Sequence, residues 1–426
     1  MFLLLNKKRK MMDKLSRSKL SKKETKNPKK DLLRLSINRD STEQLRILMV
    51  IDQFNVGGTE THVLSTAREL LKRRAKVVVA AKRGKLLEPF LGLGCSVYEI
   101  DFVLDNYEPN WDQYIDHVNK LIHIIQSEKI NIVHGHQTPS GRIAKVAAEQ
   151  MDIPFVFTVH GMYYEDQFLN MLKNISSVIS VSPAVQRMLL LNGIESTVIP
   201  NGIDLMAYDA YPSFFQNDIR ASLGISDQSF VVTYAARLAW EKADICKDVI
   251  KACSELAMSS DLRLLIVGGG IHRNKVEADI DRIQRYVKKP FVHFIGEVVN
   301  MRSFYSISNC VIGTGRVGME ALACRRPLIS VGSKGFIGLV KPEHFDRTWD
   351  SWFGDHGEAE ISSQETIMKD LKLVMSLSSD QTNNYVWNGR RYVEMKFNIV
   401  NTTTKLIDVY KPILEKNDML DRFNTY

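Results

Sequence analysis

The chain has 426 residues, 44% of them hydrophobic, which is enough for two hydrophobic cores of ordinary size. It contains no apolar stretch of the roughly 18 residues that a membrane-spanning helix requires, so we expect a cytoplasmic protein. The net charge of +8 comes from residues 1–45, which contain 14 Lys or Arg and 5 Asp or Glu. The remainder is electrically balanced, which argues against nucleic acid as a partner.

Residues 1–44 form a basic tail with few large apolar side chains, and we predict that it is disordered. Two interpretations of this tail stay open. It is either simply solvated, or it makes a peripheral contact with anionic lipid at the inner face of the membrane. Each basic residue near such a surface contributes about 1 kcal/mol.

Short β-branched runs alternate with longer helical patterns from Leu45 onward, which predicts parallel strands joined by crossover helices. We expect a doubly wound, Rossmann-like N-terminal domain over residues 45–204. Its predicted helices span residues 61–74 and 111–128, and its predicted strands span residues 46–54, 76–81, 96–102, 130–136, 154–160, 178–182 and 197–200.

Residues 205–228 are polar and turn-rich, and we predict a linker there. The alternation then restarts, which predicts a second Rossmann-like domain over residues 229–398 with a helix at 243–258. Its strands are expected at 230–236, 263–267, 293–295, 310–312 and 327–331. The predicted fold class is therefore α/β, with two doubly wound domains facing across a cleft. Open α/β sheets bind ligands beyond the carboxyl ends of their strands, so the loops there are the candidate sites.

The loop after the first strand contains Gly57 and Gly58. Two glycines let the backbone approach a ligand, and the following helix start offers unpaired N–H groups that suit a phosphate. The loop lacks the lysine of a Walker motif and is not GxGxxG. A plain tight turn between strand and helix is the alternative.

Arg237 ends a strand of the second domain, and Lys242 follows five residues later. Two cations at a strand end can neutralise a diphosphate and stabilise it as a leaving group. A surface pair with Glu241 is the alternative.

Further along the chain, Gly313 and Gly315 open a predicted helix that contains Arg316, Gly318 and Glu320. The glycines free backbone amides at the helix start, and we expect Glu320, in the first helical turn, to accept hydrogen bonds from a ribose. A buried structural carboxylate is the alternative. A nucleotide base could lie against the loop at Gly268 and Gly269.

His160 ends a strand of the first domain, where a histidine can bond a sugar hydroxyl or a phosphate. His134 and His136 flank a glycine at the previous strand end, without a carboxylate or cysteine at ligand spacing, so no metal site is predicted. The cysteines show no CxxC pair and are predicted to be buried thiols of a reducing compartment: Cys95, Cys246, Cys253, Cys310 and Cys324.

These features, in this order, resemble the retaining family 4 glycosyltransferases of GT-B fold from about Leu45 to Tyr410. The resemblance consists of an ordered set of short motifs: Gly57-Gly58-Thr59-Glu60, Val133-His134-Gly135-His136, Thr158-Val159-His160-Gly161, Val181-Ser182-Pro183, Ile199-Pro200-Asn201-Gly202-Ile203-Asp204, Arg237 with Lys242, Val267-Gly268-Gly269-Gly270, and Met319-Glu320-Ala321-Leu322-Ala323-Cys324 before Pro327.

The resemblance implies a residue-specific site. Arg237 and Lys242 would hold the diphosphate of a nucleotide sugar, Glu320 its ribose, and His160 would face the transferred sugar. Gly57 and Gly58 would reach the donor phosphates from the acceptor-side first domain, and residues 399–426 would form a helix that crosses back onto that domain. The leaving phosphate would help to deprotonate the acceptor, with retention of configuration and without a metal or other cofactor. The implied substrates are a UDP- or GDP-sugar and a saccharide or lipid-linked acceptor of a cell-surface polymer.

One departure from the family concerns its two glutamates, the first of which contacts the sugar. The two glutamates are separated by seven residues, and with Glu320 as the second, the first position is Ile312. Isoleucine cannot accept a hydrogen bond, so we expect backbone groups of Gly313, Gly315 and Arg316 to contact the sugar instead. Residues 341–357, with Trp349 and Trp352, replace an expected glycine-rich turn, and the sequence assigns them no role.

Three other functions are alternatives. A nucleotide-sugar epimerase would need acid and base carboxylates that the sequence does not pair. A catalytically silent nucleotide-sugar-binding protein fits Ile312 but leaves the retained Arg237, Lys242 and Glu320 without a purpose. A dinucleotide oxidoreductase would need GxGxxG after a strand, which is missing at the right place.

Overall fold

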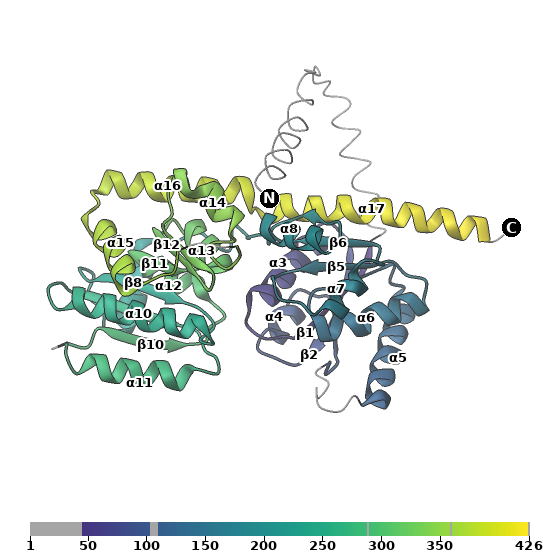
Figure 1. Ribbon diagram of the computed structural model, residues 1–426, viewed down its shortest axis with the longest axis horizontal. Coiled ribbons are helices and arrows are strands. Elements are labelled where there is room, and N and C mark those ends of the chain that lie inside the picture. The colour runs from purple at the N-terminus through teal and green to yellow at the C-terminus, as the bar shows by residue number, and fades with distance from the viewer. Residues whose placement is uncertain (1–44, 103–109, 288, 358–359, 425–426) are drawn as a thin grey trace, which may run out of the picture. The chain divides into compact units, whose positions relative to one another are not determined.

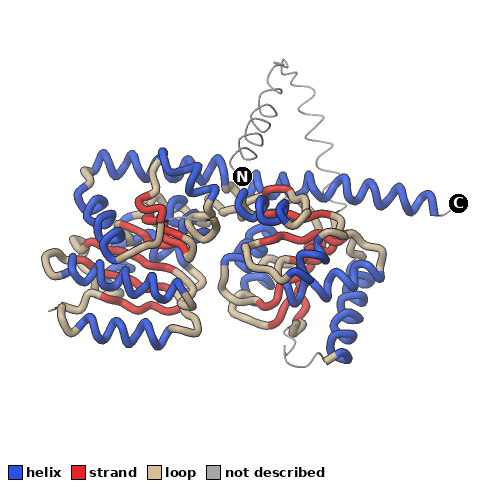
Figure 2. Tube along the Cα trace, viewed as in Figure 1, coloured by secondary structure: helices blue, strands red, loops and turns tan. Residues whose placement is uncertain are grey.

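We describe the protein from a computed structural model, which covers residues 45–102, 110–287, 289–357 and 360–424. The basic tail at 1–44 lies outside the described residues, so both interpretations of it stay predictions. Figure 1 shows two α/β domains, and Figure 2 shows that the strands of each sheet are covered by helices. The predicted fold class is confirmed.

The first domain is built on a seven-stranded sheet of order β3-β2-β1-β4-β5-β6-β7, in which all neighbouring strands are parallel. The strands are β1 (Arg46–Gln53), β2 (Lys76–Lys82), β3 (Ser96–Glu99), β4 (Ile132–Gly135), β5 (Phe155–Val159), β6 (Ser177–Ser180) and β7 (Thr197–Val198). All seven predicted strands are present. Because the strands are parallel, their carboxyl ends share one edge, where the candidate loops meet.

The helices of the first domain are α3 (Gly58–Lys72), α4 (Leu87–Leu91), α5 (Trp111–Glu128), α6 (Thr138–Gln150), α7 (Asp166–Leu172) and α8 (Pro183–Leu191). Helix α5 has the predicted bounds because the Asn110 side chain caps its start, accepting from the Gln113 N–H at 3.0 Å, and Lys129 ends it in a left-handed conformation. Helix α3 begins three residues before the prediction, since Gly57 is its N-cap.

Both faces of the first sheet are buried. Leu48 and Val50 of β1 pack with apolar residues of α5 and α6 on one face. Ile47 and Met49 pack with α3 on the other. A strand buried on both faces reads as a continuous apolar run, which is how β1 appears in the sequence.

The second domain has a six-stranded sheet of order β10-β9-β8-β11-β12-β13. Its strands are β8 (Phe230–Ala235), β9 (Leu262–Val267), β10 (Val292–Gly296), β11 (Cys310–Gly313), β12 (Leu328–Gly332) and β13 (Gly335–Leu339). The first five are parallel, as predicted. Strand β13 was not predicted and pairs antiparallel with β12 at the edge of the sheet.

The helices around this sheet are α9 (Ser213–Ser222), α10 (Glu241–Ala257), α11 (Arg273–Gln284), α12 (Met301–Ile307), α13 (Gly315–Ala323), α14 (Phe345–Asp350), α15 (Gln364–Ser376) and α16 (Ser379–Lys396), with a short 3-10 turn η1 (Pro342–His344). No described helix, in either domain, has the length and hydropathy to cross a membrane. All five cysteines are buried free thiols, as predicted.

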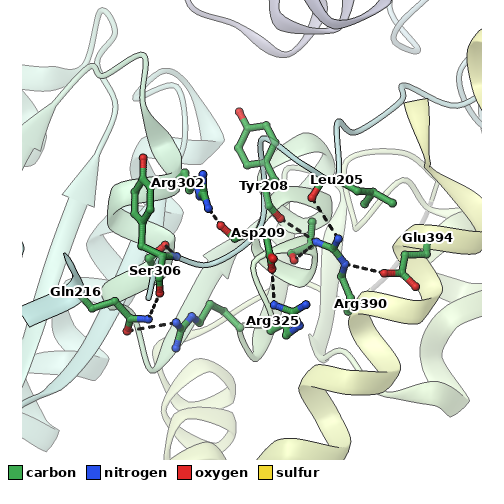
Figure 3. Close-up of polar contacts among 12 residues, drawn as sticks. Leu205, Tyr208, Asp209, Gln216, Arg302, Ser306, Arg325, Arg390 and Glu394 are labelled. Atoms are coloured by element: carbon green, nitrogen blue, oxygen red, sulfur yellow. Dashed lines mark hydrogen bonds and ion pairs between the residues drawn. The ribbon is translucent and has the colours of Figure 1, made fainter. Parts of the chain in front are cut away.

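The segment predicted as a linker is held by arginines of the second domain (Figure 3). Arg390 of α16 donates to the carbonyls of Tyr208 at 2.9 Å and Leu205 at 3.2 Å. Arg302 donates to the Asp209 carbonyl, and Arg325 pairs with the Asp209 carboxylate. The segment also contains α9, which packs on α12.

The last helix, α17 (Ile399–Asn424), belongs to the core of the first domain. It packs against α3, and its Leu406, Ile407 and Tyr410 are buried. The Tyr410 hydroxyl lies 2.6 Å from Nδ1 of His134 in β4. The chain crosses between the domains at two adjacent places, because Ile203 donates its N–H to Phe397 O at 2.7 Å and accepts from the Ile399 N–H at 3.0 Å.

Candidate active site

Charged side chains gather at the carboxyl end of the second sheet. Arg237 follows β8 and is exposed. Lys242 is the second residue of α10, and its Nζ lies 2.8 Å from Oδ2 of Asp355. The sequence-based alternative, a pair with Glu241, is not among the ion pairs of the described residues. The cation therefore points to a carboxylate more than a hundred residues away in the chain.

Asp355 is fixed by its own hydrogen bonds. Its Oδ1 accepts from the Ser333 N–H at 3.1 Å and from the Ser333 hydroxyl at 3.3 Å. Burial would raise the pKa of this carboxyl, but Lys242 and Ser333 more than offset burial and hold the pKa below its usual range. Asp355 is therefore a charged carboxylate at neutral pH.

The segment at 341–357, which the sequence left without a role, packs on the start of α13. The carbonyl of Phe353 accepts from the hydroxyls of Thr314 at 2.7 Å and Ser330 at 2.9 Å. Gly315 has a φ of +52°, and a Cβ there would lie 3.2 Å from Nε1 of Trp352. This contact explains the glycine and brings Asp355 beside the helix start.

Gly268 and Gly269 have a structural reason to be glycine. A Cβ on Gly268, whose φ is +140°, would lie 1.9 Å from the carbonyl oxygen of Ala236. A Cβ on Gly269 would lie 2.7 Å from Oε1 of Glu297. The loop after β9 thus packs closely against the loop after β8 that carries Arg237, and its part in base binding stays a prediction.

The loop after β1 carries Gly57 to the vicinity of Arg237. A Cβ on Gly57 would lie 2.3 Å from Oε2 of Glu60 and 3.1 Å from Nη2 of Arg237, whereas a Cβ on Gly58 would meet nothing within 4 Å. Burial raises the pKa of Glu60, although a hydrogen bond from Gln137 at 2.9 Å opposes the shift. The sequence assigns Glu60 no role beyond its place in the Gly57-Gly58-Thr59-Glu60 motif.

Glu320 is buried and engaged within the protein. It is the sixth residue of α13, so the expectation that it lies in the first turn is wrong. Its Oε1 lies 2.7 Å from Nε of Arg316, and its Oε2 accepts from the Tyr305 hydroxyl at 3.0 Å. Arg316 also donates to Gly202 O at 3.2 Å. These contacts fit the alternative that Glu320 is a buried structural carboxylate, and its binding of a ribose stays a prediction.

Ile312 does not occupy a site position. It lies inside β11, between β8 and β12, and its side chain is 0% exposed in the core of the second domain. A side chain at this position points into the core, and the spacing-based alignment with the first family glutamate stays a prediction. Gly313, the next residue, is also closely packed, since a Cβ there would lie 2.5 Å from Cγ1 of Val317.

Histidines gather at the carboxyl end of the first sheet. Nε2 of His160, after β5, lies 3.2 Å from Nδ1 of His136, after β4, and both rings contact the ring of His62. His134 Nε2 lies 2.8 Å from the Thr158 hydroxyl. Burial lowers the pKa of His160 and His134 to about 3, so both are neutral at pH 7. Across the described residues, no group of three or more His, Cys, Asp or Glu side chains is arranged to hold a metal.

The two sheet ends suit different parts of a ligand. The second offers Arg237, Lys242 and the unpaired N–H groups at the start of α13, which together attract an anion. The first offers neutral imidazoles, which form hydrogen bonds without carrying charge.

Two family models match the chain in tandem. The model described as Glycosyltransferase Family 4 matches residues 56–206, and the model described as Glycosyl transferases group 1 matches residues 215–360. The chain is 23% identical over 313 residues to the UDP-Gal:alpha-D-GlcNAc-diphosphoundecaprenol alpha-1,3-galactosyltransferase of Escherichia coli, covering 68% of this chain and 77% of that protein. It is 24% identical over 278 residues to the N-acetyl-alpha-D-glucosaminyl L-malate synthase of Bacillus anthracis, covering 60% of this chain and 70% of that protein.

Solved structures share the fold. A glycosyltransferase from Rickettsia africae superposes with a TM-score of 0.69 at 19% identity, covering 87% of this chain and 98% of that chain. HepE of Anabaena in complex with UDP and glucose superposes with a TM-score of 0.69 at 17% identity, covering 86% of this chain and all of that chain, 100%.

Proposed function

The chain belongs to the family 4 glycosyltransferases of GT-B fold, and we propose that it transfers a hexose or N-acetylhexosamine from a UDP- or GDP-sugar to a saccharide or lipid-linked acceptor. The observation that carries this proposal is the cationic end of the second sheet, where Arg237 and Lys242 lie near the start of α13. The name of the Escherichia coli relative, with a UDP-sugar donor and a diphosphoundecaprenol-linked acceptor, supports the substrate classes.

The donor diphosphate would lie against these positive groups. The Arg237 guanidinium can bind two phosphate oxygens at once, and Lys242 has further N–H donors beyond the one directed at Asp355. The start of α13 adds the positive end of a helix dipole. Such groups stabilise the charge that develops on the leaving nucleotide, so we propose that transfer proceeds without a metal ion.

The neutral histidines limit what the first domain does in the reaction. With a pKa of about 3, His160 can orient a sugar hydroxyl but is too weak a base to take a proton from it at neutral pH. We therefore assign deprotonation of the acceptor to the leaving phosphate, which would give retention of configuration.

The test is a thermal-shift screen of the purified protein against UDP, GDP, ADP, NAD and common UDP-sugars, with EDTA present throughout. We expect UDP or GDP and their sugars to raise the melting temperature, because a ligand that binds only the folded state stabilises it. A response to NAD alone, or to no nucleotide, would reject the proposal. A response that appears only when Mg²⁺ replaces EDTA would reject metal independence.

We also propose that the tail at 1–44 holds the enzyme at an anionic membrane surface in the cytoplasm, where a lipid-linked acceptor would lie. The excess of basic over acidic residues in residues 1–45, 14 against 5, supports this attraction. Deletion of residues 1–40 should abolish cosedimentation with anionic liposomes and leave donor hydrolysis intact. Cosedimentation of the truncated protein would contradict the role of the tail.

A further inference from the structure

The two-glutamate pattern of the family loses its first member here, and the structure points to its replacement. Building on the proposed function, we infer that Asp355 is the carboxylate that accepts a hydrogen bond from a hydroxyl of the sugar carried by the donor. This assigns a role in sugar selection to the segment at 341–357, which no sequence motif marks.

A replacement from another part of the chain is required by the geometry of β11. Ile312 is inside the strand with a 0% exposed side chain, and α13 begins at Gly315, directly after Thr314. The connection between strand and helix is therefore a single residue, Thr314, and its hydroxyl already donates to the Phe353 carbonyl at 2.7 Å. Neither Ile312, which points into the core, nor Thr314, whose hydroxyl is engaged, supplies the missing carboxylate.

Asp355 lies at the place where the donor sugar has to be recognised. Its Oδ2 is 2.8 Å from Nζ of Lys242, one of the two proposed diphosphate ligands. The same oxygen is 3.9 Å from the position of a Cβ on Gly315, the first residue of α13. The sugar is bonded directly to the diphosphate, so a carboxylate between the cation and the helix start is within reach of its hydroxyls.

The carboxylate has capacity for a ligand. Oδ1 accepts two hydrogen bonds from Ser333, and Oδ2 accepts one from Lys242. A carboxylate has about four lone-pair sites, so a site remains on Oδ2. The side chain is 18% exposed, which leaves it accessible. Hydrogen bonds from hydroxyls to an ionised carboxylate are stronger than those between neutral groups.

The experiment compares Asp355→Asn with Asp346→Asn, a matched control on the exposed face of α14 in the same segment. Binding of UDP and of the UDP-sugar that stabilises the wild type is measured by calorimetry, and donor turnover is measured on the same samples. We expect Asp355→Asn to lower turnover and UDP-sugar affinity at least tenfold, by the loss of a hydrogen bond to a charged acceptor. UDP affinity should be unchanged or higher, because Lys242 loses its internal partner.

Each outcome decides the inference. Equal losses for UDP and the UDP-sugar would mean that Asp355 only positions Lys242, and no loss for either would mean that it contacts neither; both overturn the inference. Ser333→Ala, which keeps the carboxylate but removes one of its hydrogen-bond donors, should give a smaller loss of the same kind. Ser333→Ala replaces Asp355→Asn as the test variant if Asp355→Asn does not fold. A wild type that binds no nucleotide would instead reject the proposed function itself.

Discussion

The polar side chains at the carboxyl end of the first sheet are neutral, whereas those at the carboxyl end of the second sheet are charged. At the end of the first sheet, His134, His136 and His160 pack against one another, and burial keeps them neutral. At the end of the second, Lys242 and Asp355 are charged and paired, and Arg237 is exposed.

This difference in charge indicates which domain binds which part of a nucleotide sugar. A diphosphate needs cations, and burying it against neutral imidazoles alone would leave its charge uncompensated. Sugar hydroxyls need no compensating charge, so they can bond either to the closely packed neutral histidines of the first domain or to a carboxylate of the second. We therefore assign the diphosphate to the second domain and contacts with the hydroxyls of sugar and acceptor to both.

The largest expected effect comes from removing the cations. Arg237→Ala and Lys242→Ala should each weaken UDP binding more than tenfold, because a hydrogen bond to a charged group contributes about 1.5 to 3 kcal/mol. Calorimetric titration with UDP measures the change. Lys251→Ala, on the same helix as Lys242 but paired with Asp248, is the control and should bind UDP as the wild type does. Unchanged affinity in both site variants would contradict this assignment, since the diphosphate charge would then be neutralised by other residues.

The neutral state of the histidines predicts how stability depends on pH. Burial lowers the pKa of His134 to about 3, whereas in the unfolded chain the pKa returns to about 6.5. Between these values the unfolded chain binds a proton that the folded protein does not, so acidification destabilises the fold. The contribution of His134 to the free energy of unfolding is fully present above pH 6.5. Below pH 6.5 it falls by up to about 1.4 kcal/mol per pH unit.

The measurement is urea unfolding from pH 7.5 to 5 for the wild type, His134→Asn and His123→Gln. Asp52 and Glu60 act in the opposite sense, because burial raises their pKa, so the histidine effect is read from the difference between variants. His134→Asn should show a shallower dependence on pH than the wild type. His123→Gln, at an exposed position of α5, should follow the wild type. Parallel curves for all three proteins would show that His134 is not held neutral.

The smallest effect is expected at the loop where Gly57 approaches Arg237. Gly57→Ala would place a Cβ 2.3 Å from Glu60, so we expect a melting temperature below that of the wild type by a few degrees. Gly58→Ala, which meets nothing within 4 Å, should match or exceed the wild type, since Ala favours a helix more than Gly. Equal melting temperatures for the two variants would mean that the Glu60 side chain moves away from a Cβ at position 57 without loss of stability.

Local signals in the sequence predicted the strands and the candidate residues at their ends. Parallel strands buried on both faces are apolar runs, and the helical pattern from residue 111 to 128 predicted α5 with its observed bounds. The pairing of Lys242 with Asp355 could not be predicted, because it joins residues 113 positions apart through a segment without a motif. The burial of Ile312 could not be predicted from its spacing to Glu320 either, because spacing does not show that a single residue connects β11 to α13.

The adjacent crossings at Ile203 and Phe397 make the second domain an insertion into the first. The first domain consists of two stretches of chain, 45–203 and 399–424, joined in one core by Tyr410 and His134. A fragment that ends near residue 204 would expose the apolar surface that α17 covers. A recombinant first domain should instead connect Ile203 to Ile399 through a short linker, because hydrogen bonds already hold these two residues side by side.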